Sequence, residues 1–216
     1  MVVGHYAVAM GAKTFAPRTS LGTLVAAGAF LDLVWPVLVL AGIEVVTVTP
    51  GATAANPLTF VSYPWSHSLL TSIVWGAAFA AAYFAARRYA AGAIALGILV
   101  VSHCVLDAIV HVPDLPLTPW ADARIGLGVW NSLPLSLTIE LALFALGAGV
   151  YFRATTPRDR AGSWGLAGMI LLMLVIYAGA VFGPPPPNAS TVAWSDMGQW
   201  LIVALAAWVD RHRRTV

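Results

Sequence analysis

Residues 90–110 read AAGAIALGILVVSHCVLDAIV, an apolar run of the length that an α-helix needs to cross the hydrocarbon core of a bilayer. Near its end, His103 and Asp107 are four residues apart, and His111 follows after another four. On a helix these three side chains share one face. Because an ionisable side chain at this depth needs a partner, a metal ion or a water-filled cavity, the run predicts both a membrane helix and a polar site.

The composition of the whole chain agrees with a membrane environment. Of its 216 residues, 60% are hydrophobic and only 9% are charged, whereas a soluble domain carries about 25% charged residues. Membrane lipid is therefore the predicted solvent and partner. The net charge is only +2, and the basic residues are scattered at the ends of apolar runs. No nucleic-acid partner is predicted.

Six apolar runs are each close to the ~20 residues of a spanning helix. They cover residues 21–43, 67–86, 90–110, 132–152, 164–182 and about 194–209. A shorter apolar piece, Val2–Phe15, lacks the basic start of a signal peptide and is predicted to be a half-span helix. The predicted fold is an all-α, polytopic integral membrane helical bundle with about six transmembrane helices and a short N-terminal helix. It forms one domain over residues 1–216, with the site core in 4–115 and additional membrane helices in 132–209.

The basic residues predict how the bundle is oriented. If all six runs cross the membrane, ten of the eleven basic residues lie on one side, and only Arg124 lies on the other. The ten are Lys13, Arg18, Arg87, Arg88, Arg153, Arg158, Arg160, Arg211, Arg213 and Arg214. By the positive-inside rule that side is cytoplasmic, which predicts a bacterial inner-membrane protein with a cytoplasmic C-terminus. The connections 44–66 and 111–131 then face outward.

Ligand-type residues from several runs are expected at one depth. His103 and Asp107 lie in the outer half of the third run, His67 opens the second run after a predicted helix cap at Ser66, and Asp32 lies near the middle of the first. His5 reaches a similar depth if Lys13 sits at the inner surface. Imidazoles with one or two carboxylates are a typical ligand set for zinc and other transition metals. The sequence therefore predicts a divalent metal ion, zinc in particular, open to the outer side.

Four motifs occur in a familiar order. They are Gly4-His5, Leu31-Asp32-Leu33, Ser66-His67-Ser68-Leu69-Leu70 and Ser102-His103-x-x-x-Asp107. In this order they resemble the membrane-bound metal-dependent hydrolases, which are also described as LexA-binding inner-membrane-associated hydrolases. The resemblance covers roughly residues 4–115 and implies that the metal ligands are His5, Asp32, His67, His103 and Asp107.

The chain departs from that family at two places. The second acidic residue expected near Asp32 is replaced by Val34, which favours one metal ion over two. Tyr63-Pro64-Trp65 stands where a basic residue often precedes the position of His67, so a group that would stabilise phosphate charge is missing.

The predicted function is metal-dependent hydrolysis of a lipid or lipid-linked ester or phosphoester at the outer-leaflet side. Asp107 or Asp32 would act as ligand or base, with Asp114 and Glu140 as further candidate catalytic residues. Two alternatives use the same sequence features. One is a non-enzymatic protein that translocates protons or metal ions through these side chains. The other is a structural subunit of a larger membrane complex.

Overall fold

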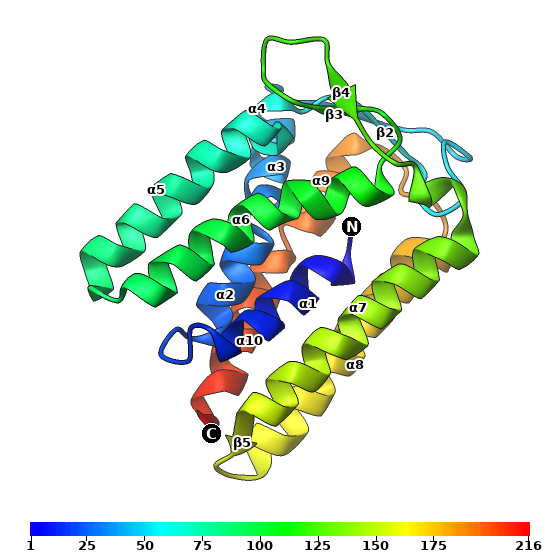
Figure 1. The fold of residues 1–216 in the computed structure, drawn as a ribbon. Helices are drawn as coiled ribbons and strands as arrows, with labels where there is room; N and C mark the ends of the chain where they lie inside the picture. Colours follow the sequence, from blue (N-terminus) through cyan, green and yellow to red (C-terminus); the bar gives the residue numbers. More distant parts are fainter.

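The structure is a computed structural model that describes residues 1–216, and it is a mostly helical bundle (Figure 1). Five helical segments are long and apolar enough to cross a membrane, or six if one bent helix pair is a single span. The helices are α1 (Val3–Gly11), α2 (Leu21–Gly28), α3 (Phe30–Leu40), α4 (Pro64–His67), α5 (Leu69–Arg87), α6 (Ala90–Val110), α7 (Leu133–Ala154), α8 (Arg160–Phe182), α9 (Ala189–Asp196) and α10 (Gln199–Arg211). The predicted fold class is confirmed.

Short strand pairs and 3₁₀ turns connect these helices. The strands are β1 (Val45–Val48), β2 (Leu58–Ser62), β3 (Leu115–Pro116), β4 (Arg124–Ile125), β5 (Thr155–Pro157) and β6 (Arg213–Thr215). They form three separate antiparallel pairs, β1 with β2, β3 with β4 and β5 with β6. The chain also contains two short 3₁₀ helices, η1 (Ala12–Thr14) and η2 (Val129–Asn131). The connections predicted to face outward therefore contain two small hairpins.

The first predicted span is not one straight helix. It is divided into α2 and α3, which meet at an angle of 56°. The break falls at Ala29, directly after Gly28, which lies against α1 at His5. A side chain at Gly28 would collide with that backbone, so the glycine allows α1 to pack against the bend.

The last predicted span is also composed of two helices. Helices α9 and α10 together form one apolar stretch from Ala189 to Arg211. The stretch begins earlier than the predicted residue 194, because Asn188 caps α9 by accepting a hydrogen bond from the backbone N–H of Thr191. A short break at Met197 and Gly198 separates the two helices.

Helix α1 is a half-span helix held inside the bundle. Its nine residues extend about 14 Å at 1.5 Å per residue, and it contacts α2, α6 and α7 (Figure 1). Gly147 of α7 allows a close approach, since a Cβ there would collide with the backbone of Ala7. The first turn of α1 is thereby fixed in the interior, where it carries His5.

Apolar side chains also cover the outside of the bundle. Ile94 and Ile98 on α6, Leu146 on α7 and Leu171 on α8 each expose more than 60% of their surface. Such a surface suits contact with lipid and would be unfavourable in water.

The basic residues gather at one end of the bundle. Strand β6 near the C-terminus pairs with β5, Thr215 donates a hydrogen bond to the Pro17 carbonyl, and the Arg18 guanidinium lies over the ring of Tyr89. Arg124 in β4 lies at the opposite end, with the β1-β2 hairpin (Figure 1). The ten-to-one division expected from six crossings is therefore present in the fold.

Candidate metal centre

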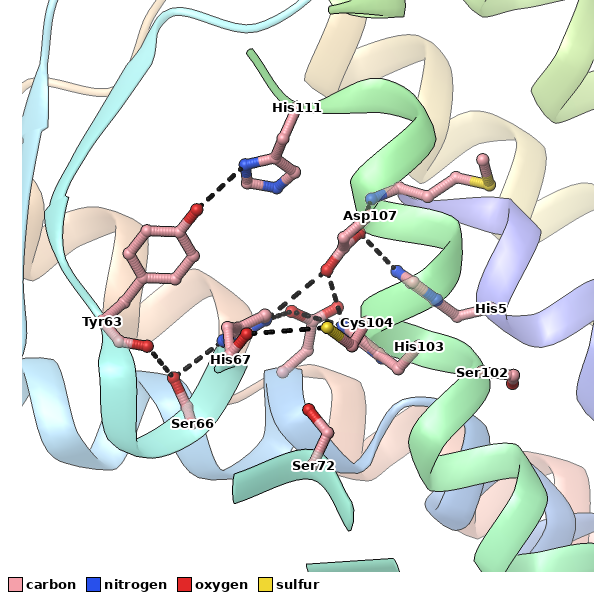
Figure 2. Close-up of polar contacts among 12 residues, drawn as sticks. His5, Tyr63, Ser66, His67, Ser72, Ser102, His103, Cys104, Asp107 and His111 are labelled. Carbon is pink, nitrogen blue, oxygen red and sulfur yellow. Dashed lines mark hydrogen bonds and ion pairs between the residues drawn. The ribbon is translucent and has the colours of Figure 1, made fainter. Parts of the chain in front are cut away.

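Five ionisable side chains from four helices meet in the interior. Figure 2 labels His5, His67, His103 and Asp107 among them. His5 comes from the first turn of α1, Asp32 from the first turn of α3 and His67 from the end of α4. His103 and Asp107 lie one turn apart on α6. All but Asp32 are almost completely buried, and the side chain of Asp32 is 23% exposed.

Asp107 lies at the centre of this cluster because both of its carboxylate oxygens face histidines. Its Oδ1 is 3.2 Å from His5 Nε2, and its Oδ2 is 3.2 Å from His103 Nε2 and 3.7 Å from His67 Nε2. The amino group of Met1 also contacts Oδ1. Without a positive charge nearby, a buried carboxylate of this kind would be strongly destabilising.

Asp32 faces the same two histidines as Oδ2 of Asp107. Its Oδ1 is 3.3 Å from His67 Nε2 and 3.5 Å from His103 Nε2. Ligand bonds of 2.0–2.2 Å in a tetrahedral zinc site place neighbouring donor atoms about 3.3–3.6 Å apart. The separations among these side chains are close to that spacing.

Two histidines are oriented by partners behind them. His103 Nδ1 lies 2.8 Å from the carbonyl oxygen of Gly28, which can only accept, so the ring hydrogen is on Nδ1. His67 Nδ1 lies 2.7 Å from Ser66 Oγ, and that hydroxyl donates its hydrogen to Glu44 Oε2 at 2.6 Å. His67 must therefore also carry its hydrogen on Nδ1. In both rings the Nε2 lone pair is directed into the cluster, as in metal-binding histidines.

His5 differs from the other two histidines. Its Nδ1 is buried without any hydrogen-bond partner. A hydrogen there would be an unsatisfied buried donor, so the ring hydrogen belongs on Nε2, which donates to Asp107 Oδ1. This geometry makes His5 an orienting partner of Asp107, whereas the family resemblance implies a metal ligand.

The cluster fits a metal ion by its donor chemistry. His103 Nε2 is buried and has no hydrogen-bond partner. The donor atoms of Asp32, His67 and His103 lie within 4.8 Å of one another, and so do those of His5, His103 and Asp107. These buried His/Asp groups could hold a metal ion, and imidazole with carboxylate suits zinc among others.

Glu44 and Ser66 belong to the site and were not among the predicted site residues. Glu44 is buried and accepts hydrogen bonds from the backbone N–H groups of Trp65 and Ser66 as well as from the Ser66 hydroxyl. The expectation that Ser66 caps the second span is wrong, because Ser68 caps α5 by accepting from Thr71. The sequence feature that could have indicated Glu44 is its position as an acidic residue directly after the apolar run 21–43.

Asp114 and His111 form a neighbouring polar group. Asp114 Oδ1 accepts a hydrogen bond of 2.9 Å from the Tyr63 hydroxyl and lies 3.0 Å from His111 Nδ1. Burial, reinforced by the charge of Asp114, raises the pKa of Tyr63, so its hydroxyl stays a donor. Asp114 therefore does not contact the five-residue cluster, although the ring of Tyr63 lies 5.5 Å from that of His67.

Glu140 has a structural partner. Its carboxylate accepts hydrogen bonds from the backbone N–H groups of Val2 and Gly4 at 2.9–3.1 Å. A carboxylate at the N-terminus of a helix satisfies free N–H groups and stabilises the helix dipole. Glu140 thus holds the first turn of α1 in place and acts on the cluster through the position of His5.

A cavity of about 690 Å³ reaches the cluster. Asp32, His67 and Asp107 line it, whereas His5 and His103 lie behind them. The rest of its wall comes from the first residues and α1, from α3, from the β1-β2 hairpin, from His111 and η2, and from α7, α8, α9 and α10. Its size is that of a small-molecule site, and it reaches the exposed edge of the cluster.

Comparisons with protein-family models, with curated proteins and with solved structures found no match for this chain. The site is therefore characterised by its own geometry, a buried His/Asp cluster at the wall of a cavity.

Proposed function

We propose that the chain is a membrane-embedded, metal-dependent hydrolase that cleaves a lipid ester from the outer-leaflet side. One observation carries the proposal: the Nε2 atoms of His67 and His103 face oxygens of Asp32 and Asp107 at 3.2–3.7 Å, beside a cavity. Ionisable side chains buried inside a membrane bundle are energetically costly, so a cluster of them usually belongs to a functional site.

His67, His103 and Asp107 would hold one divalent cation, with zinc as the best chemical fit, and the remaining position beside Asp32 would stay open for water. The acceptors Gly28 and Ser66 keep both imidazoles in the tautomer that a ligand needs. His5 would keep the Asp107 carboxylate in position. When bound, the cation would make a water molecule more acidic and polarise the scissile carbonyl.

Asp32 is the best candidate for the general base. Both oxygens of Asp107 face histidines, whereas only Oδ1 of Asp32 does so, and Asp32 is the most exposed member of the cluster. The free Oδ2 can take a proton from a water molecule at the cavity edge. As water adds to the carbonyl and the ester C–O bond breaks, that proton passes to the departing alcohol.

The test uses the full chain purified in a non-ionic detergent. Metal content and hydrolysis of long-chain esters in the same micelles are measured for the wild type and for His67→Ala and Asp107→Ala. We expect both variants to lose metal and turnover. Matched controls are His212→Ala and Asp122→Ala at exposed or half-exposed positions away from the cluster, which should change neither.

One outcome would replace this proposal. If a folded, metal-loaded sample hydrolyses no member of a broad ester panel, while proton or metal flux into vesicles depends on Asp107, the cluster belongs to a translocating protein. The fold gives that reading little support, since Ala7, Ala9 and Met10 fill the interior between His5 and Lys13 with buried apolar side chains.

A further inference from the structure

The cavity beside the cluster has an unusual balance of charge. Four carboxylates line it, from Asp32, Asp107, Glu140 and Asp196. Its lining contains no lysine or arginine, and its one fixed positive charge is the amino group of Met1, which is paired with Asp107. A pocket that receives phosphate or another anion normally supplies Arg, Lys or free backbone N–H groups. The missing basic side chains make this cavity unsuited to an anionic head group.

Three of the four carboxylates already face a charged group or a helix N-terminus, whereas Asp196 has only a hydrogen bond with the neutral side chain of Gln199. Asp32 and Asp107 face the histidines, and a divalent cation would neutralise them further. Glu140 accepts hydrogen bonds from the start of α1. Asp196 forms none of the ion pairs of the structure, although it lies at the end of α9, which packs against the α3 helix of Asp32. Asp196 is thus the carboxylate left for a ligand.

Aromatic rings and apolar side chains complete the cavity. Tyr6 and Tyr177 line it together with Trp35, and aromatic faces attract cations. Leu172 and Ile176 of α8 and Leu201 of α10 also line it and are 41%, 46% and 73% exposed on the outside of the bundle. These three residues mark a lateral opening toward lipid through which an alkyl chain can enter.

We propose that this cavity binds an amphiphile with a positively charged amine head, which Asp196 holds while the alkyl chain lies against α8 and α10. The substrate of the proposed hydrolase would then be an amine-bearing lipid ester, a class that rests on the proposed function. Binding of the amine itself does not depend on the metal centre being catalytic. An anionic lipid phosphoester is excluded as the preferred ligand by the same charges.

The test measures binding rather than turnover. Tetradecylamine, tetradecanol and tetradecyl phosphate are each added at the same mole fraction to the full protein in dodecyl maltoside micelles. Binding is followed by displacement of a fluorescent alkylamine and by thermal unfolding. We expect the amine to bind at least about tenfold more tightly than the phosphate, because the ammonium group is attracted to the Asp196 carboxylate and the phosphate group is repelled by it.

The variants separate the roles of the residues. Asp196→Asn should reduce the preference for the amine to near parity, and Asp196→Glu should keep it. Asp122→Asn, an exposed outer-loop control, should have no effect. Circular dichroism and gel filtration check that each variant is folded. Equal or tighter binding of the phosphate, or an amine preference unchanged in a folded Asp196→Asn sample, would overturn the proposal.

Metal content is measured on the same samples to keep the two proposals apart. Loss of the amine preference in a protein that binds metal and hydrolyses esters refutes the substrate class alone. An amine preference in a protein that binds no metal refutes the hydrolase and leaves the amine site in place.

Discussion

The imidazole of His5 lies flat on that of His103, with ring centroids 3.5 Å apart and ring planes within 3° of parallel. The stack places two histidines on one carboxylate, Asp107, yet only His103 has an acceptor behind its ring. The two residues therefore have different roles in the same cluster.

Glutamine should replace His5 far better than it replaces His103. The amide nitrogen of glutamine lies near the place of Nε2, so His5→Gln keeps the hydrogen bond to Asp107, and metal affinity should stay near the wild-type value. His5→Ala leaves Asp107 less well oriented and should lower affinity about 10–100-fold. His103→Gln removes a ligand and should abolish binding. Isothermal titration calorimetry with zinc measures the affinity of all three variants. An equal loss of affinity in His5→Gln and His103→Gln would show that His5 is a metal ligand.

Removing the hydroxyl behind His67 should weaken the metal centre. In Ser66→Ala, the ring loses the acceptor that fixes its tautomer, and Glu44 loses a hydrogen bond. Zinc affinity should fall about 10–100-fold. Ser102→Ala is the matched control, because that hydroxyl bonds only to the Leu99 carbonyl in its own helix. An affinity unchanged by Ser66→Ala would show that the hydrogen-bonded chain does not orient His67.

Metal removal should destabilise the bundle. A ligand that binds only the folded state adds about 2.7 kcal/mol of stability when present at 100 times its Kd. Chelation should therefore lower the Tm in detergent, and zinc should restore it. In Asp107→Asn, chelator and zinc should leave the Tm unchanged. A wild-type Tm that does not respond to either treatment would contradict the metal centre.

The buried ion pair at the basic end should support stability without affecting the site. Lys13 Nζ donates to Asp210 Oδ2 at 2.8 Å, and the Tyr151 hydroxyl donates to Oδ1 of the same carboxylate. Lys13→Met leaves that carboxylate without its counter-charge, which typically costs about 3–5 kcal/mol. Thermal unfolding should show the loss, whereas metal content per folded molecule should match the wild type. Lower metal content in the folded fraction would reveal coupling between the two ends.

Cysteine labelling should establish the orientation in the membrane. The native Cys104 is buried and should stay unreactive. In intact cells, a membrane-impermeant maleimide should modify Ala52→Cys in the β1-β2 hairpin connection, and Thr14→Cys only after the membrane is opened. The reverse pattern would place the C-terminus outside.

The sequence predicts the bundle well and the site only in part. Hydrophobic length determines the spans, and the four-residue spacing of His103 and Asp107 places both on one face of α6. The bend at Ala29 is not visible in a uniformly apolar run, because it depends on the packing of α1 against Gly28. The roles of Glu44 and Ser66 likewise arise from tertiary hydrogen bonds between segments that the chain order separates.

The bend between α2 and α3 has a consequence for protonation. In an unbroken helix the carbonyl of Gly28 would be used by the N–H four residues later. At the end of α2 it receives the Nδ1 hydrogen of His103 instead. Because a membrane offers no water to a carbonyl without a helical partner, the imidazole supplies the hydrogen bond that the Gly28 carbonyl needs. The bend between α2 and α3 thus selects the tautomer of His103 in α6. A straight helix would use the Gly28 carbonyl for its own hydrogen bond and leave the Nδ1 hydrogen of His103 without this acceptor.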